Sequence, residues 1–556
     1  MTDGQYGRPQ VWSVVGHCEA KTEERHSGPR PLAGEAGARN LPAEGRASSY
    51  RHPRAGNATQ AGQQPERASC TPHVVALILG ATFIRLFFAA SLGLGVDESY
   101  MVASGRQLAL GYFDHPPAAW WLSWAAAHLG GSEAPLVVRL PFIGLFAVST
   151  WLMYRLGTTV GGQRAGLWAA VLLNLSPVFG VTTGTWVLPD GPLTCALLGA
   201  ALCLVHGLAE ARGRAFAWWC GSGVCAGLGL FSKYTAMLSI AGAVAFLLSS
   251  REHRVWLTRA EPYVAALIAL LIFTPVLAWN ASHHWASFAF QSERAAGVAF
   301  HPLGPFIVFA GEALFVLPWI WAPMMVLFIA ALRRGPGEWR SWLLSCLAAP
   351  PILVFALVAA WSGQRVLFHW AAPGYLMLFP LLGAAVAARI HRAPVQWAVL
   401  GTAAFVVAGV VVIATAVRWD WLHGVTIAVM DRDPEAEAID WTSLRGDLVA
   451  RGLIHPSSPV GVPDWRNTGK IAHALGPEVT VFCVCRDARQ FGLSVPADAF
   501  KGEDVLLLVP DHAARTVSEL SPHFTAIEPL QPVEIRLSGR PLQEVSVFVG
   551  HGFRGL

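Results

Sequence analysis

Apolar runs of about 20 residues recur along most of this chain, and they constrain its fold more than any other feature. A run of that length is what an α-helix needs to cross the hydrocarbon core of a bilayer. Of the 556 residues, 54% are hydrophobic and only 14% are charged, which excludes an ordinary soluble protein. A net charge of +4 is too small to indicate a nucleic-acid partner. The pattern predicts an all-α polytopic membrane protein.

Composition divides the chain into three predicted domains. Residues 1–72 are rich in Gly, Ala, Arg, Glu and Pro without periodicity, which predicts a disordered N-terminal tail. Residues 73–418 form the predicted transmembrane domain, with about 11 or more helices. The spans are expected near 73–96, 135–154, 165–187, 191–210, 215–231, 235–250, 261–280, 303–331, 342–361, 366–388 and 395–417.

Hydropathy falls after residue 418, and residues 419–556 have the pattern of a small soluble α/β domain. Short β-rich runs occur at Val479–Val484 and Asp504–Val509, and a terminal hairpin is expected across Ser538, Gly539 and Arg540. Helices are predicted at 434–451 and 512–520. Cys483 and Cys485 share a face of one strand and are expected to be buried core thiols rather than a functional pair.

Arginine is concentrated in alternate loops between the predicted spans. If the amino terminus is cytoplasmic, the inner loops contain Arg155, Arg164, Arg212, Arg214, Arg251, Arg254, Arg259, Arg333, Arg334, Arg340, Arg389 and Arg392. The opposite loops hold few cations, and this asymmetry is the one that membrane proteins show between cytoplasmic and outer loops. It predicts that loop 97–134 and residues 419–556 are extracytoplasmic. The expected location is the plasma (inner) membrane of a bacterium.

The loop at 97–134 carries two acidic motifs at the predicted membrane surface. Asp97 and Glu98 follow the first apolar run, and Asp114 and His115 precede two prolines. Because consecutive prolines fix φ and remove backbone donors, Asp114 and His115 are expected at a rigid corner. The tryptophans that follow are typical of a membrane–water boundary.

Further polar residues fall on the same predicted face at the ends of later spans: Asp190, Lys233, Arg294, Arg365 and His369. Arg and Lys bind phosphate oxygens and stabilise the charge that develops on a leaving phosphate. A carboxylate near an acceptor hydroxyl removes its proton as a new bond forms. Acids on one loop and cations on others therefore suit glycosyl transfer from a lipid-linked phosphate.

Several of these residues also have a plainer explanation. Lys233, Arg294 and Arg365 are placed as single snorkelling anchors at helix ends would be. Asp190 precedes Gly and Pro, which favours a helix N-cap. Glu98 is expected to be a solvated or structural partner rather than a catalyst. The histidines at 283, 284 and 301 are expected at the membrane interface rather than as ligands.

Together the motifs resemble the first outer loop of family 39/83 glycosyltransferases, which include protein O-mannosyltransferases and the bacterial aminoarabinose transferases of lipid A. The resemblance rests on DESY at 97–100 and GYFDHPP at 111–117, and it extends from about 73 to 420. LPDGPL at 188–193, FSKYT at 231–235 and HW at 369–370 are similar to other stretches of the family. It implies the GT-C fold, a polyprenyl-phosphate sugar donor and inversion at the anomeric carbon.

On this resemblance, Asp97 corresponds to the acid that activates the acceptor, and Asp114 to a second acid of the loop. His115 stands where aminoarabinose transferases have a lysine that faces the lipid phosphate, and Arg294 corresponds to their phosphate-binding arginine. The histidine that precedes this arginine in those enzymes is not found at Glu293, so no metal ligand is assigned and a divalent cofactor is left open. Asp97 is thus the predicted catalytic residue; the predicted donor-binding residues are Asp114, His115, Lys233, Arg294 and Arg365, and the supporting residues are Glu98, Tyr100, Asp190 and His369.

The sequence thus predicts an integral membrane glycosyltransferase that moves a monosaccharide from a polyprenyl-phosphate donor to a lipid, glycan or protein acceptor on the extracytoplasmic face. Its partners would be the lipid-linked sugar, membrane lipids and the acceptor, without nucleic acid. One alternative is a flippase or transporter that moves lipid-linked sugars without chemistry, but no two-half repeat is evident. Another is a binding or assembly factor with a degenerate site.

Overall fold

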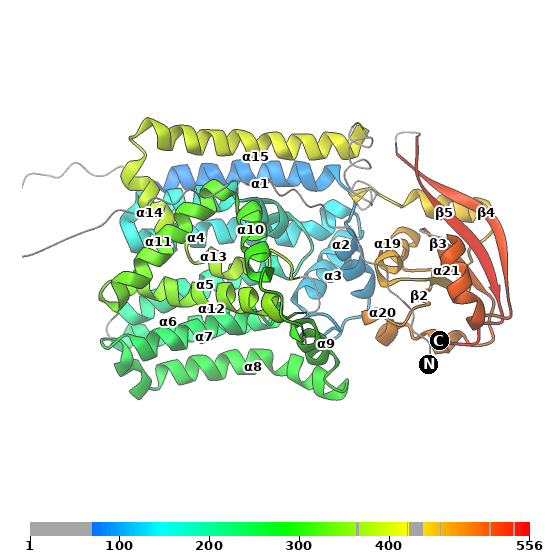
Figure 1. Cartoon of the computed structure of the whole chain (residues 1–556), viewed down its shortest axis with the longest axis horizontal. Helices are drawn as coiled ribbons and strands as arrows, with labels where there is room; N and C mark the ends of the chain where they lie inside the picture. Colours follow the sequence, from blue (N-terminus) through cyan, green and yellow to red (C-terminus); the bar gives the residue numbers. More distant parts are fainter. Residues whose placement is uncertain are drawn as a thin grey trace, which may run out of the picture. The chain divides into compact units, whose positions relative to one another are not determined.

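The computed structural model describes residues 69–210, 212–297, 299–362, 366–419, 421, 438–455, 458–510, 513–537 and 540–556. The predicted tail at 1–72 lies almost entirely outside these residues. Long apolar helices fill one part of the described chain, and a mixed sheet with short helices forms the other (Figure 1). The division into three domains at the predicted boundaries stays a prediction.

The helical part contains α1 (Thr71–Ser91), α2 (Val96–Ser104), α3 (Ala118–Gly130), α4 (Pro135–Leu175), the π-helix η1 (Val178–Thr183), α5 (Asp190–Ala209), α6 (Arg212–Ser232), α7 (Ala236–Ser249), η2 (Arg254–Thr258), α8 (Glu261–Ser282), α9 (Ala286–Ala295), α10 (Gly304–Val316), α11 (Pro318–Arg334), η3 (Gly335–Gly337), α12 (Trp339–Trp361), α13 (Ala372–Leu376), α14 (Phe379–Arg389) and α15 (Ala393–Trp419). Within the described residues, 8 helices are long and apolar enough to cross a membrane, or up to 9 when the bent pair α10–α11 is counted as one span. The protein is therefore a multi-pass membrane protein.

This count is lower than the predicted 11 for three local reasons. Two predicted spans fall within α4, which is counted once although Gly161 and Gly162 leave helical geometry; the chain turns there so that Gly157 packs against Gly166, and α4 therefore consists of two helices, as predicted. α10 and α11 meet at an angle of 115°. α7 has only 14 residues, fewer than a helix needs to cross a bilayer.

A buried arginine in α1 fixes the irregular segment that leads to the site. Arg85 donates through Nε to the carbonyl of Gly180 at 2.9 Å and through Nη2 to Asn174 Oδ1 at 2.9 Å. Its guanidinium also lies 4.4 Å from the ring centre of Phe146. These contacts hold the π-helix η1, whose backbone pattern leaves carbonyls that need other donors.

The C-terminal part, which we call the outer domain after its predicted extracytoplasmic position, is built on a five-stranded sheet of order β2-β1-β3-β5-β4. Its strands are β1 (Val460–Val462), β2 (Val481–Cys483), β3 (Val505–Val509), β4 (Ala526–Leu537) and β5 (Arg540–His551). β1 is parallel to β2 and β3, whereas β5 is antiparallel to β3 and β4. The helices are α18 (Ser443–Ala450), α19 (Trp465–Leu475), α20 (Arg489–Ser494), η4 (Ala497–Phe500), α21 (Ala513–Leu520) and η5 (Ser521–His523).

The predicted elements of this domain are largely confirmed. The β-rich runs at 479–484 and 504–509 contain β2 and β3, and the terminal hairpin is β4–β5. The helix predicted at 512–520 is α21. The first half of the helix predicted at 434–451 lies outside the described residues, and the second half contains α18.

The outer domain packs directly on α2 of the membrane domain (Figure 1). Lys470 of α19 is buried and donates to the carbonyl of Leu94, just before α2, at 2.8 Å. The neighbouring Gly469 lies against Tyr100, where a Cβ atom would come within 2.7 Å of the Tyr100 Cα. Only glycine allows this approach, and buried residues of both domains form one hydrophobic cluster there.

Candidate active site

Glu98 is a structural group at the start of α2. Its Oε2 accepts from the N–H of Gly95 at 2.9 Å, and Arg139 of α4 donates to its two oxygens at 2.8 and 2.5 Å. Burial would raise the pKa of Glu98, but the Arg139 charge and these hydrogen bonds outweigh it and lower the pKa. Glu98 is therefore a buried structural partner that holds α2 against α4, and it is not solvated.

Asp190 and Lys233 form a second buried ion pair. Lys233 Nζ donates to both carboxylate oxygens of Asp190 at 2.9 Å, which joins the start of α5 to the break between α6 and α7. The predicted N-cap role of Asp190 is wrong, because Pro189 holds the cap position and the Asp190 carboxylate faces Lys233 instead. A buried ammonium needs this counterion more than an apolar helix needs a cap.

Asp114 lies at the corner between α2 and α3, as the prolines predict. The hydroxyl of Tyr100 donates to its Oδ2, and Nη1 of Arg489 lies 3.3 Å from its Oδ1. Burial raises the pKa of Asp114 to about 6, although the Arg489 charge and the Tyr100 hydrogen bond oppose the rise. The carboxylate is therefore ionised at neutral pH but gains its proton in mildly acidic solution.

The two predicted histidines are neutral. Burial, and next the charge of Lys233, lower the pKa of His115 well below its ordinary value and the pKa of His369 to about 4. Both rings can donate or accept hydrogen bonds at neutral pH but supply no charge. Nδ1 of His115 is buried, and no group within the described residues is hydrogen-bonded to it.

Arg294 differs from the two paired cations. It is the penultimate residue of α9, and its guanidinium lies 5.4 Å from the ring centre of Phe290 and 4.5 Å from that of Trp370. It forms no ion pair within the part of the chain that the structure describes. Burial and the nearby charge of Arg489 lower its pKa. A half-buried cation supported by aromatic rings suits an anionic ligand.

These groups line one cavity of about 510 Å³. Every predicted site residue within the described residues contributes to its wall: Asp97, Glu98, Tyr100, Asp114, His115, Asp190, Lys233, Arg294 and His369. Arg365 lies outside the described residues. A smaller cavity of about 130 Å³ shares His115, Lys233, Arg294 and Trp370 with the first, and its far wall consists of apolar side chains of α12.

Sequence reasoning missed Arg139 and two arginines that the outer domain contributes to the cavity. Arg466 and Arg489 reach it from the outer domain, more than 300 positions beyond the acidic loop. A possible signal was the pair Cys483 and Cys485, which stands just before Arg489. The two cysteines form a disulfide, so the prediction of buried core thiols is wrong.

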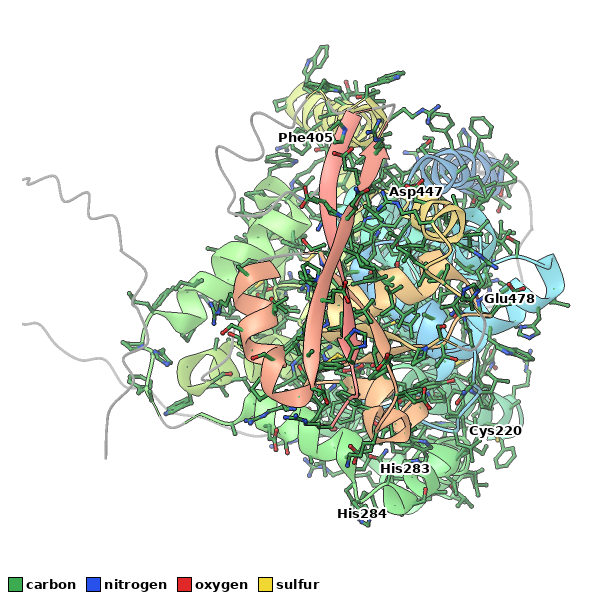
Figure 2. All side chains as sticks on the ribbon, turned by 90° about the vertical axis from the view of Figure 1, so that its right-hand side faces the viewer. Cys220, His283, His284, Phe405, Asp447 and Glu478 are labelled. Atoms are coloured by element: carbon green, nitrogen blue, oxygen red, sulfur yellow. A yellow bond between two sulfur atoms is a disulfide. The ribbon has the colours of Figure 1, made fainter. Side chains whose placement is uncertain are left out.

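The other histidines considered above lie away from this cavity. His283 and His284 follow the end of α8 and lie at the edge of the molecule (Figure 2). His301 lines a different cavity, beside α10. Within the described residues, no group of three or more His, Cys, Asp or Glu side chains is arranged to hold a metal ion. The need for a cofactor stays open.

The sequence and the fold of this chain have known counterparts. The dolichyl-phosphate-mannose-protein mannosyltransferase family matches residues 114–279. The chain also resembles the solved structure of ArnT from Cupriavidus metallidurans bound to undecaprenyl phosphate, with a TM-score of 0.61 and 14% identity over 86% of this chain and 98% of that one. The apo structure of the same protein gives a TM-score of 0.60. The protein therefore has the GT-C fold of membrane glycosyltransferases, with a small C-terminal sheet domain.

One curated relative is more similar in sequence. It is the lipid A galacturonosyltransferase RgtD of Rhizobium johnstonii, which is 26% identical over 298 residues. The match covers 50% of this chain and 58% of the relative. The resemblance to polyprenyl-phosphate-dependent glycosyltransferases, predicted from the motifs, is confirmed by these matches.

Proposed function

We propose that this protein is a membrane glycosyltransferase that moves one monosaccharide from a polyprenyl phosphate to an acceptor hydroxyl or phosphate, with inversion at the anomeric carbon. The observation that carries this proposal is that Asp97, Asp114 and Arg294 line one cavity at the junction of the two domains. The similarity to RgtD and to ArnT with its bound carrier lipid supports it.

Asp97 is the best-placed general base. It is the second residue of α2, lines the cavity and is exposed, so a proton that it accepts can pass to water. Asp114 is buried and committed to Tyr100 and Arg489, and Glu98 is committed to Arg139. Of the three acids of this loop that line the cavity, Asp97 alone is exposed.

The reaction would be a single displacement. The acceptor oxygen bonds to the anomeric carbon as Asp97 takes its proton, and the bond between that carbon and the phosphate oxygen breaks. The phosphate leaves with the electron pair, so its charge increases during the step. Arg294 is placed to stabilise this charge, and the neutral ring of His115 is placed to hydrogen-bond the same group.

Lys233 has a different position in this scheme from the one predicted. Its charge is neutralised by Asp190, so its contribution to phosphate binding is smaller than that of Arg294. The smaller cavity, with Val354, Phe355 and Val358 of α12, offers an apolar surface next to these cations. That arrangement suits a lipid whose charged head enters the site from the membrane.

The acceptor and the location belong to the same proposal. We infer a lipid acceptor, because RgtD is named for its action on lipid A. We place the protein in the bacterial plasma membrane with a cytoplasmic amino terminus and an extracytoplasmic outer domain. The Cys483–Cys485 disulfide supports this side, since disulfides persist in oxidising compartments. The matched family and the curated relative are both named as transferases, which favours the transferase over a carrier.

The direct test is turnover by the purified protein. Incubation with a radiolabelled polyprenyl-phosphate sugar and a membrane extract should release polyprenyl phosphate and label a lipid. Asp97→Asn should abolish release, whereas Asp498→Asn, at an exposed outer-domain carboxylate paired with Lys501, should have no effect. Near-normal turnover by Asp97→Asn would reject the base assignment. Binding without turnover by the wild-type protein would favour a carrier or a degenerate binding factor.

A further inference from the structure

Two guanidinium groups from different domains converge on one wall of the cavity. Arg294 comes from α9 of the membrane domain, and Arg489 is the first residue of α20 in the outer domain. Their guanidinium carbons lie 5.4 and 5.3 Å from the ring centre of the same residue, Phe290. Two like charges held beside one ring repel each other, and the Asp114 carboxylate, 3.3 Å from Arg489, supplies only one negative charge against the two positive ones.

The backbone and side chain of Arg489 are held firmly in this position. Arg489 has φ of 48°, a left-handed conformation that costs a non-glycine residue free energy and persists only where the surroundings impose it. Its guanidinium lies 3.5 Å from the ring centre of Trp465. The next residue, Gln490, donates its N–H to the Tyr100 hydroxyl at 3.0 Å and accepts from the N–H of Phe113 at 3.0 Å.

Three buried polar atoms around Arg489 have no hydrogen-bond partner within the described residues. They are Nε of Arg489, Oδ1 of Asp114 and Nδ1 of His115. Nε of Arg489 is 3.7 Å from Asp487 and Nη1 is 3.3 Å from Asp114, and in this geometry the contacts give charge attraction without a hydrogen bond. Buried polar atoms are nearly always satisfied in native proteins, so this group indicates a polar ligand.

We propose that Arg489 binds the phosphate of the lipid carrier together with Arg294. This inference rests on the proposed function and extends it to the outer domain. A sugar phosphodiester carries one negative charge, and the phosphate that leaves carries up to two. A second guanidinium therefore strengthens binding most as the bond breaks. The outer domain is then a part of the catalytic site, and the donor binds only when α20 is docked on α2.

The experiment measures binding of undecaprenyl phosphate to the full-length protein in nanodiscs. Arg489→Gln should raise the dissociation constant about 10- to 100-fold, as expected for the loss of a charged hydrogen bond. Arg294→Gln should have a similar effect, and Arg489→Lys should restore part of the affinity. Arg515→Gln is the matched control, because Arg515 is exposed and, among the described residues, pairs with the exposed Glu519 of the same helix. Undecaprenol, which lacks the phosphate, should not distinguish these variants.

The outcomes separate this inference from the proposed function. If Arg294→Gln binds undecaprenyl phosphate weakly but Arg489→Gln binds it as the wild type does, the inference is overturned and the proposed function stays intact. An Arg489→Gln variant whose only defect is a raised KM for the acceptor would have the same consequence. A wild-type protein that does not bind undecaprenyl phosphate would overturn both. If Arg489→Gln folds poorly, the Arg489→Lys variant is used instead. We expect Arg489→Lys to unfold at the wild-type temperature and to bind undecaprenyl phosphate more weakly than the wild type; wild-type affinity would overturn the inference.

Discussion

The cavity has two walls that differ in how completely their charges are satisfied. On the membrane-domain side, Glu98 with Arg139 and Asp190 with Lys233 form buried pairs with hydrogen bonds of 2.5 to 2.9 Å. On the side shared with the outer domain, Asp114 is 3.3 Å from its cation and three buried atoms lack partners within the described residues. The first wall is complete without a ligand, whereas the second is completed by one. The first should therefore control stability, and the second activity.

The largest effect is expected at Glu98. Glu98→Gln leaves Arg139 buried without a full counterion, which costs about 3–5 kcal/mol of unfolding free energy. The variant should therefore be recovered in low yield and should unfold at a much lower temperature in detergent. Its neighbour Asp97 provides the matched control, because Asp97→Asn should lose turnover and keep its unfolding temperature. Wild-type stability of Glu98→Gln would contradict the division between the two walls.

Arg294 should show the opposite behaviour. Arg294→Gln removes the cation that stabilises the leaving phosphate, so turnover should fall about 100-fold or more. Because Arg294 forms no ion pair within the described residues, the unfolding free energy should change by less than about 0.5 kcal/mol. Parallel assays of turnover and thermal unfolding test this. A destabilised variant with a normal rate per folded molecule would place Arg294 in the structural wall instead.

Asp114 should introduce a pH dependence. Below its pKa of about 6 the carboxyl is protonated and no longer balances Arg489, so turnover should fall about tenfold per pH unit. Since the folded-state pKa lies above the ordinary value, protonation favours the folded state. The stabilisation of the folded state by Asp114 is present at low pH and is lost as the pH rises through 6. Acid unfolding caused by Asp114 therefore does not explain the loss of turnover at low pH. The turnover of Asp114→Asn should not fall in this way below pH 6. If it falls as in the wild type, another group causes the pH dependence.

The disulfide should have the smallest effect. Cys483 and Cys485 are separated by 2 in sequence, so their bond restricts the unfolded chain only slightly. The bond should act mainly by fixing the segment that leads to Arg489. Changing both cysteines to serine should therefore lower turnover a few-fold with little change in unfolding temperature. Cys220→Ser, in α6 (Figure 2), is the matched control and should leave turnover unchanged. A large loss of stability would show a core role instead.

The sequence was sufficient for the membrane-domain half of the site. Because each span crosses the membrane, residues at alternate span ends lie on the same membrane face. Asp97, Lys233 and Arg294 were therefore expected to lie together, and they line one cavity. Hydropathy does not report which groups pair. It therefore could not show that Lys233 neutralises Asp190 or that Arg139 neutralises Glu98.

The outer-domain half could not be predicted in the same way. Arg466 and Arg489 reach the cavity because Gly469 and Lys470 dock α19 on α2, a tertiary contact with no periodic signature. The short strands were predicted from β-rich runs, since alternation and turn residues are local signals. Among the described residues, the count of 8 or 9 is lower than the predicted 11 because α4 is counted once although it contains two helices, and because α7 is short, which the apolar pattern does not reveal.

The measurement that tests the central claim most directly is a structure of the full-length protein with undecaprenyl phosphate bound. We expect the phosphate in the cavity between the two walls, within hydrogen-bond distance of Arg294. We expect the lipid chain to leave along α12. The account would be contradicted if the phosphate lay elsewhere and did not contact Arg294. The apolar cavity between α5, α6, α7 and α8 is one such place.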